Sequence, residues 1–423
     1  MISGEGRPTV SPRRPGRDYA LLFGNNLIFF TAINLVSAVT ILPVFVSHLT
    51  DSTVLVGMVP AMVQLSFSVP QILGPSLFAA TRIKKWRLAA SNIVGASAFA
   101  LFGLSVIRFG DSRPSLILAM FFLALIMLNG SAGIGATGWV DIVGKIIDKE
   151  IRGRFFGASH AAGGIVGAIG IGIAAQVLGN DAFPDGYGIL ITIAGLMIVG
   201  GGVLFLFLRE PASPESDTRN RRFWASMRGI PGAVAGDRQF LHYAGARVAV
   251  AWAVAASAFI TVFGSREFGA SDADIARLTT VFLLSQVAGS LGGGMVGDRF
   301  GVRSLLVAGS LASLGAVVVA ALATDLILIY VAIAIAGLVS MLIVADITMV
   351  LDTAPESRRP AYMAALNLIL GPLSLPAPLI LGLLVDVAGF RMMFTIAIAL
   401  ALIGLAAALS FALRPPRTVE AGP

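Results

Sequence analysis

Long apolar runs, each bounded by a short polar or charged stretch, recur along almost the entire chain. A helix needs about 20 mostly apolar residues to cross the hydrocarbon core of a membrane. Runs of this length predict twelve spanning helices, with both termini on one side of the membrane. They lie near residues 20–48, 54–80, 88–107, 114–143, 156–179, 187–208, 240–264, 275–297, 304–323, 326–350, 362–385 and 392–413. The pattern therefore predicts an all-α membrane protein.

Composition supports a membrane protein and argues against several other classes. Hydrophobic residues make up 57% of the 423 residues and charged residues 13%, whereas a soluble domain has about 25% charged residues. The chain has no cysteine and three widely separated histidines, so we expect no disulfide, no metal site and no cofactor. No nucleophile, base and orienting group stand out, so an enzyme is not expected. Nucleic-acid binding is not expected either, because basic loops explain the net charge of +7.

Basic residues set the expected orientation. Of the 30 Lys and Arg residues, 24 fall on the side of the termini and 5 on the opposite side. Cytoplasmic loops carry the excess of positive charge in membrane proteins. Both termini are therefore expected in the cytoplasm, in a multi-pass protein of the cytoplasmic (inner) membrane. The first apolar run is too long for the core of a signal peptide, so it is expected to be an uncleaved span.

The two halves of the chain resemble each other. The fourth and tenth predicted spans end in DIVGKIIDKEIRGRFFG (141–157) and DITMVLDTAPESRRPAYM (346–363), and in each an aspartate is followed by a basic pair. Such a repeat predicts two six-helix bundles related by a pseudo-two-fold axis. The expected divisions are a disordered cytoplasmic N-terminus (1–17), an N-terminal bundle (18–208), a cytoplasmic linker with an amphipathic helix (209–239), a C-terminal bundle (240–413) and a cytoplasmic tail (414–423).

The stretch GSLGGGMVGDRFGVR (289–303) carries two overlapping patterns. Its glycines include the G-x-G-x-x-G spacing of a dinucleotide-binding turn. Such a turn follows a strand, whereas this one follows an apolar helix, so we interpret the match as accidental. The second pattern is a loop signature, G-x-x-x-D-R-x-G-x-R. Its residues are Gly294, Asp298, Arg299, Gly301 and Arg303.

With this signature and the segment RGRFFG (152–157), the chain resembles the major facilitator superfamily of secondary transporters over residues 18–413. The stretch LPVFVSHLTDSTVLVG (42–57) is similar to a poorly characterised prokaryotic branch of that superfamily, which implies no particular substrate. The resemblance implies a fold of two six-helix bundles that rock against each other. It also implies that the fourth span lines the cavity. Asn129 stands there in place of an arginine that family exporters link to proton transfer, which argues against their mechanism here.

The resemblance assigns a gating role to the loop signature. Asp298, with Arg299 and Arg303 as partners, would latch the cytoplasmic side when that side is closed, because a carboxylate is stabilised by arginines and by a helix N-terminus. Gly294 and Gly301 complete the signature. The alternative is a solvated loop whose charges only set the topology.

Polar residues within the first span are candidates for contact with a substrate. Asn26, Asn34 and Ser37 fall within an arc of about 80° on a helix of 3.6 residues per turn. They either line the cavity as one polar stripe or form hydrogen bonds to neighbouring helices.

Charged residues within the spans are costly and usually functional. Arg247 in the seventh span either binds an anionic substrate, pairs with Asp346, or extends to the inner interface. Asp346 in the tenth span and Asp141 in the fourth either carry a proton or form salt bridges.

These features predict secondary active transport of a small solute across the cytoplasmic membrane by alternating access, with proton coupling left open. The expected partners are a small-molecule solute, the lipid bilayer and, if transport is coupled, protons. A monomer is expected. Two alternatives stay open: an exporter of amphipathic compounds, and a non-transporting membrane sensor on the same fold. The sequence favours neither uptake nor export.

Overall fold

The structure, a computed structural model, describes residues 16–71, 73–79, 81–148, 151–178, 183–212, 234–354 and 359–413. Every regular element within these residues is a helix, as the hydrophobic pattern predicts. The predicted cytoplasmic tail lies outside the described residues. So do most of the predicted N-terminus and the whole FWASMRGIPGAV segment of the linker (223–234) except its last residue.

The helices follow one another without an intervening sheet. In the first half they are α1 (Gly16–Leu35), α2 (Ile41–Leu49), α3 (Thr53–Gln71), α4 (Gly74–Ala79), α5 (Lys85–Phe109), α6 (Pro114–Ile146), α7 (Arg152–Leu178), α8 (Asp185–Leu204) and the short 3-10 helix η1 (Phe205–Phe207). In the second half they are α10 (Arg238–Val254), α11 (Ser257–Phe268), α12 (Asp272–Ala321), α13 (Leu326–Leu338), α14 (Met341–Thr353), α15 (Arg359–Ser374) and α16 (Pro376–Ala412).

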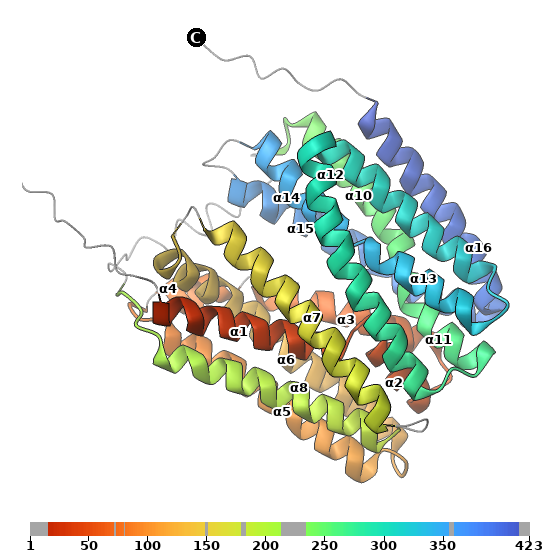
Figure 1. Ribbon diagram of the computed structural model, residues 1–423, viewed down its shortest axis with the longest axis horizontal. Helices are drawn as coiled ribbons and strands as arrows, with labels where there is room; N and C mark the ends of the chain where they lie inside the picture. Colours follow the sequence, from red (N-terminus) through yellow and green to blue (C-terminus); the bar gives the residue numbers. More distant parts are fainter. Residues whose placement is uncertain are drawn as a thin grey trace, which may run out of the picture.

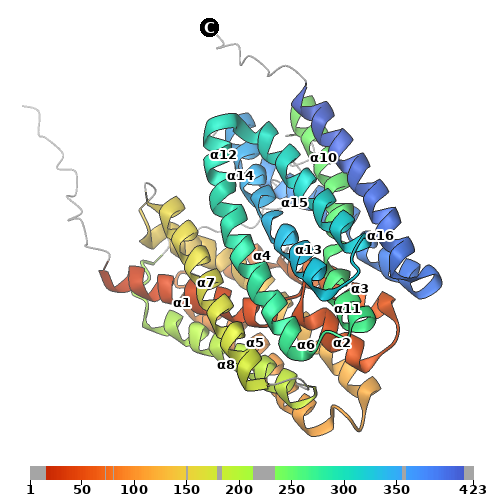
Figure 2. The ribbon, with the colours of Figure 1, turned by 45° about the vertical axis from the view of Figure 1, so that its right-hand side comes forward.

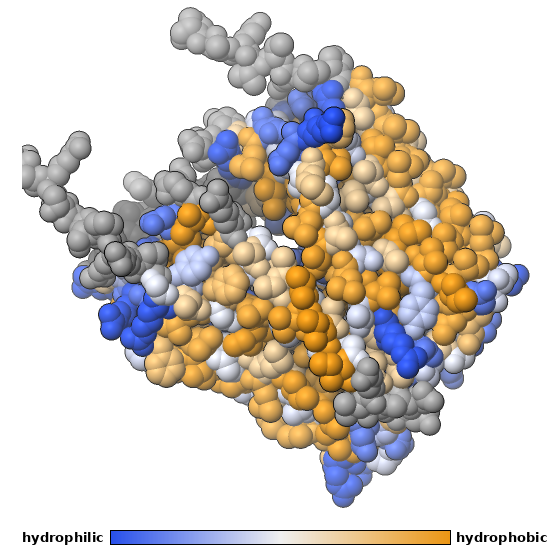
Figure 3. Space-filling model, viewed as in Figure 1, coloured by the Kyte–Doolittle hydropathy of each residue, from blue (hydrophilic) through white to orange (hydrophobic). Residues whose placement is uncertain are grey.

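Eight helical segments within the described residues are long and apolar enough to cross a membrane. Apolar side chains cover much of the surface between the two ends of the molecule, and polar side chains gather mostly at those ends (Figure 3). This distribution fits a lipid environment, because only an apolar surface is stable against hydrocarbon. An all-helical membrane fold is therefore confirmed.

Two of the long helices change direction at a glycine. Gly301 in α12 has φ 76° and ψ 178°, and Gly389 in α16 has φ 80° and ψ 169°. Residues with a Cβ atom rarely adopt a positive φ, whereas glycine does so without steric cost. Each of these long elements therefore consists of two helices joined at a sharp turn.

The first apolar run is not one helix, in contrast to the continuous span expected over 20–48. α1 ends at Leu35 and α2 begins at Ile41. Between them, the Ser37 hydroxyl accepts hydrogen bonds from the backbone N–H groups of Val39 and Thr40, at 3.3 and 3.2 Å. These bonds satisfy backbone donors that the interrupted helix leaves unpaired.

Figures 1 and 2 show α1–α8 gathered on one side of the molecule and α10–α16 on the other. α7 lies along α12, and α3 lies along α16, and these are two of the helix pairs that join the halves. The start of α1 lies at the left of Figure 1 and the end of α16 at its top, and we call the side of the molecule that carries both the terminus end. α2 and α11 lie toward the lower right, which we call the distal end.

The segment that connects the halves is anchored at both ends. The Glu210 carboxylate accepts hydrogen bonds from the backbone N–H groups of Lys84 and Lys85, at 2.7 and 2.8 Å. The Asp237 carboxylate accepts from the N–H of Phe240 and from the Tyr362 hydroxyl, both at 3.0 Å. The first contact fixes the start of the connection to the first half, and the second fixes its end to the second half.

Candidate functional site

A cavity of about 480 Å³ lies between the two halves. Its size is within the range of about 300–1,000 Å³ that is usual for small-molecule sites. The lining is mainly apolar, with a small number of polar side chains from both halves. The polar or charged side chains are Gln64 on α3, Arg247 on α10, Ser257 on α11, Gln286 on α12, Ser340 between α13 and α14, Asp346 on α14, and Asn367 and Ser374 on α15.

An ion pair lies in the wall of this cavity. Arg247 Nε donates to the Asp346 carboxylate at 3.0 Å (Oδ1) and 3.3 Å (Oδ2). The Tyr243 hydroxyl donates to Asp346 Oδ1 at 2.7 Å. The arginine and aspartate side chains are 14% and 16% exposed, so solvent screening is weaker than for a surface pair. Of the three sequence-based alternatives for Arg247, the structure therefore contains the pairing with Asp346.

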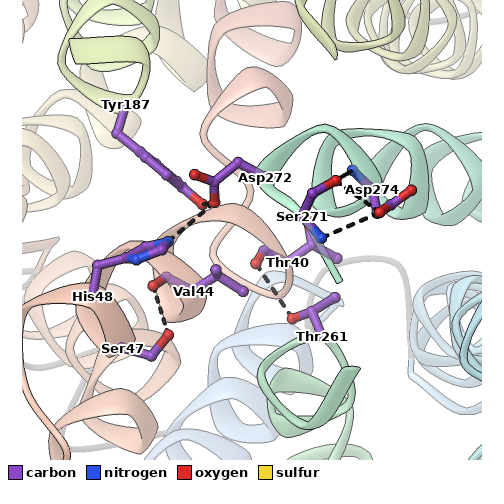
Figure 4. A network of polar contacts seen from close by, with 9 residues as sticks. All are labelled: Thr40, Val44, Ser47, His48, Tyr187, Thr261, Ser271, Asp272 and Asp274. Atoms are coloured by element: carbon purple, nitrogen blue, oxygen red, sulfur yellow. Dashed lines mark hydrogen bonds and ion pairs between the residues drawn. The ribbon is translucent and has the colours of Figure 1, made fainter. Parts of the chain in front are cut away.

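The distal end is closed by polar contacts between the halves (Figure 4). His48 Nε2 lies 3.0 Å from Asp272 Oδ1, and the Tyr187 hydroxyl donates to the same oxygen at 2.7 Å. Asp272 is only 8% exposed and lies in the first turn of α12, where the helix dipole stabilises a negative charge. Asp272 therefore ties the start of α12 to α2 and α8.

The same helix start is held by a capping box. The Ser271 hydroxyl accepts from the N–H of Asp274 at 3.2 Å and donates to the Asp274 carboxylate at 2.7 Å (Figure 4). Nearby, the Thr261 hydroxyl donates to the Thr40 carbonyl at 3.3 Å. The capping box fixes where α12 begins, next to Asp272, and the Thr261 bond adds a further contact between the halves.

A second contact closes the distal end between α3 and α16. The Asp386 carboxylate accepts from the Thr53 N–H and hydroxyl, both at 2.7 Å, and therefore caps the N-terminus of α3 from the other half. The helices also pack very closely. A Cβ atom at Gly57 or Gly382 would lie closer than 3.0 Å to a backbone oxygen of the facing helix, at Pro378 or Thr53.

The loop signature at the terminus end makes no contact between the halves within the described residues. Asp298 and Arg299 are exposed, and Asp298 makes no hydrogen bond or ion pair in the described part of the chain. Arg299 lies over the ring of its neighbour Phe300, at 5.3 Å. Arg303 Nη1 donates to the Ala412 carbonyl at 3.5 Å, within its own half. The contacts expected of the predicted latch are therefore absent among the described residues.

The two glycines of the signature differ in their surroundings. Gly301 forms the turn within α12 at φ 76°. Gly294 is helical, and a Cβ atom there would meet nothing within 4 Å. Gly289 and Gly293 are the glycines that face another element, since a Cβ atom on either would lie closer than 3.0 Å to Ser340 or Met341.

The asparagine candidates lie away from the ion pair. Asn26 donates to the Ser159 hydroxyl at 3.2 Å, and Asn34 to the Gly163 carbonyl at 3.5 Å, so both bond α1 to α7. Asn129 donates to the Leu125 carbonyl of its own helix at 2.9 Å. Asn26 also lines a separate, mainly apolar cavity of about 310 Å³ within the first half.

Asp141 belongs to a charge cluster at the terminus end. Its carboxylate lies 2.6 Å from Lys84 Nζ and 3.0 Å from Lys145 Nζ. Lys145 Nζ also lies 2.6 Å from the Glu210 carboxylate. The cluster joins α5, α6 and the start of the connecting segment, all in the first half. It corresponds to the salt-bridge alternative for Asp141.

Sequence reasoning missed several of these residues. Tyr243 precedes Arg247 by four residues, so the two lie on one helix face, and that spacing could have paired them with Asp346. His48, Tyr187 and Asp272 are separated by long stretches of chain. No local pattern in the sequence therefore indicates that these three residues meet in the folded protein.

Comparison with known proteins shows which fold the chain has. More than nine tenths of the chain shares its fold with solved transporters. A substituted form of the nucleoside transporter NupG has a TM-score of 0.73 at 12% identity, covering 94% of this chain and 100% of that one. An auto-inhibited POT family peptide transporter has a TM-score of 0.68 at 13% identity, covering 96% and 99%. A bacterial homologue of the human lysosomal transporter Spinster, inward-facing and unoccupied, has a TM-score of 0.60 at 15% identity, covering 93% and 95%.

The fold is one that solved membrane transporters share, and the apolar helices are long enough to cross a membrane. The model of the Major Facilitator Superfamily matches residues 244–423. The resemblance to this superfamily that the loop signature indicates is therefore confirmed. Comparison with curated protein sequences found no match.

Proposed function

We propose that this chain is a secondary active transporter that moves a small solute across the cytoplasmic membrane by alternating access. The observation that carries the proposal is the central cavity, which takes its lining from both halves and contains the Arg247–Asp346 pair. A site shared by two groups of helices changes its access when those groups rock against each other. Solved proteins of the same fold are named as transporters of nucleosides and of peptides, which supports a small-molecule solute here.

The proposed architecture has twelve spans in two six-helix bundles, residues 18–208 and 240–413. The turns at Gly301 and Gly389 support it, because each divides one long element into two spans. Pairs of short helices, such as α10 with α11 and α13 with α14, each supply one further span. A monomer is proposed, because each chain contains a complete cavity.

We assign this structure to the inward-facing state. The excess of basic residues on the side of the termini supports a cytoplasmic terminus end. The contacts of Asp272 and Asp386 close the distal end, which then faces the outside. Asp298, Arg299 and Arg303 are the proposed latch of the opposite state, in which the cytoplasmic side is closed.

Asp346 is the proposed coupling carboxylate. It is the one acid that lines the central cavity among the described residues, and it already forms an ion pair with Arg247. A proton on Asp346 would weaken its attraction to Arg247 and so link protonation to the shape of the cavity. Export of amphipathic compounds is the second candidate, favoured by the mainly apolar cavity within the first half.

The test is solute flux in proteoliposomes, guided by a thermal-shift screen of a solute library. Because the chain has no cysteine, a disulfide can lock the distal end specifically. The Ser52 hydroxyl and the Asp386 carboxylate lie 3.2 Å apart, so Ser52→Cys and Asp386→Cys place two thiols within reach of a short bis-methanethiosulfonate crosslinker. We expect flux of a stabilising solute to stop on crosslinking and return on reduction, with Asp386→Cys alone as the control. Flux that continues in the crosslinked protein would refute alternating access.

A further inference from the structure

Only part of the hydrogen-bonding capacity of the Arg247 guanidinium is satisfied within the described residues. Its Nε donates to Asp346, and within the described residues the two terminal nitrogens, Nη1 and Nη2, make no hydrogen bond. The side chain is 14% exposed and lines the central cavity. Four N–H donors therefore remain free on a side chain that forms part of the cavity wall.

The partner of Arg247 is held in place from a second direction. Asp346 Oδ1 accepts both the Tyr243 hydroxyl and Arg247 Nε. This arrangement orients the guanidinium, because both carboxylate oxygens lie against Nε and neither contacts an Nη group. Asp346 acts here as a positioning residue for Arg247.

The rest of the lining carries no charge. Apart from Arg247 and Asp346, every described residue around the cavity is apolar or neutral, and the side chains of Gln64, Gln286 and Asn367 supply amides. An amide both donates and accepts hydrogen bonds, so it suits hydroxyl or amide groups on a ligand. The one strong, unsatisfied feature of the cavity is thus a set of cationic donors.

From this geometry we infer that the central cavity takes a small organic anion, and that its carboxylate binds the two Nη groups of Arg247. A guanidinium fork binds a carboxylate in a bidentate manner, with hydrogen bonds about twice as strong as neutral ones. The body of the anion lies against the apolar wall, and its polar groups reach the cavity amides. The inference rests on the proposed transport function, for which it names the class of solute.

Thiol labelling tests the inference without knowledge of the natural solute. We place a single cysteine in the cavity with Gln64→Cys and compare two methanethiosulfonate reagents, one carrying a sulfonate and one a trimethylammonium group. The matched control is Ser112→Cys, an exposed position at the turn between α5 and α6, which normalises the intrinsic rates. The measured quantity is the ratio of anionic to cationic labelling rates.

We expect a normalised ratio above one, and a fall of at least about tenfold in Arg247→Gln. Asp346→Asn should raise the ratio, because it removes the negative charge and keeps Arg247. It also serves as the second variant if Arg247→Gln does not fold. A ratio that neither variant changes would overturn the inference.

Ligand protection separates binding from a general electrostatic attraction. Benzoate at millimolar concentration should slow anionic labelling of Gln64→Cys more than benzamide, which has the same shape and no charge. Equal effects of the two would overturn the assignment of a carboxylate site. Labelling does not require flux, so a chain that passes these tests and moves no anion across proteoliposomes would refute the proposed function alone.

Discussion

Gly57→Ala should shift the protein away from the state described here. Gly57 faces the backbone of α16 across the distal contact, and a Cβ atom would lie closer than 3.0 Å to the Pro378 carbonyl oxygen. That oxygen belongs to a helix backbone and cannot rotate away as a side chain could. The methyl group must therefore separate α3 from α16, and it does so only in the state in which these helices touch.

The size of the shift follows from the cost of overpacking. Extra atoms in a well-packed contact cost about 1–3 kcal/mol, which corresponds to a change of roughly 5- to 150-fold in the ratio of the two states. Alanine also favours a helix over glycine by about 1 kcal/mol, but this gain is the same in both states and cancels. Gly200→Ala on α8 is the control, because a Cβ atom there meets nothing within 4 Å.

The assay measures the distance between two spin labels at the terminus end. Arg82→Cys and Leu413→Cys place them on exposed positions of the two halves. The long distance of the inward-facing state should lose population to a shorter one in Gly57→Ala and keep its population in Gly200→Ala. If Gly57→Ala and Gly200→Ala give the same distance distribution, the close contact does not control the equilibrium.

Three further substitutions give distinct results. Asp272→Asn removes the negative charge that contacts His48 and Tyr187, and should lower the inward-facing population about fivefold. An unchanged distance distribution would show that Asp272 does not stabilise the closed distal end. Asp298→Asn should raise the inward-facing population and slow flux if Asp298 is part of the proposed latch, because this carboxylate has no partner among the described residues and its contacts are expected in the opposite state; an unaltered balance would remove it from the latch. Gly301→Ala should lower the melting temperature, because its φ of 76° and ψ of 178° lie in a region that is almost restricted to glycine and costs other residues about 1–3 kcal/mol. Gly292→Ala, with open space around it, should not; equal melting temperatures would show that the turn tolerates a side chain.

The helices could be predicted from the sequence because membrane spans have a simple physical requirement. Apolar length alone locates α5, α6 and α8. The break between α1 and α2 could not be predicted in the same way. It depends on the Ser37 hydroxyl, which satisfies backbone donors within a run that stays apolar on both sides.

The residues of the candidate site could likewise be predicted only in part from the sequence. Arg247 and Asp346 attract attention because charges are costly within a membrane, and the structure brings them together. Asn26 and Asn34 share an arc on α1, but periodicity does not tell which neighbour a helix face meets, and both bond α7 instead. Asp298 was placed by resemblance, and its role as a latch stays a prediction.

The anchored connection between the halves has a mechanical consequence. Glu210 and Asp237 fix its two ends, and about 25 residues between them can reach at most roughly 80–90 Å when extended. The contour length of this tether sets only an upper limit to the separation of its two anchors. Within that limit, close backbone contacts such as the one between Gly57 and Pro378 restrict how much nearer α3 and α16 can approach each other. Shortening the tether should leave the cycle unchanged until its reach falls to the separation of its anchors.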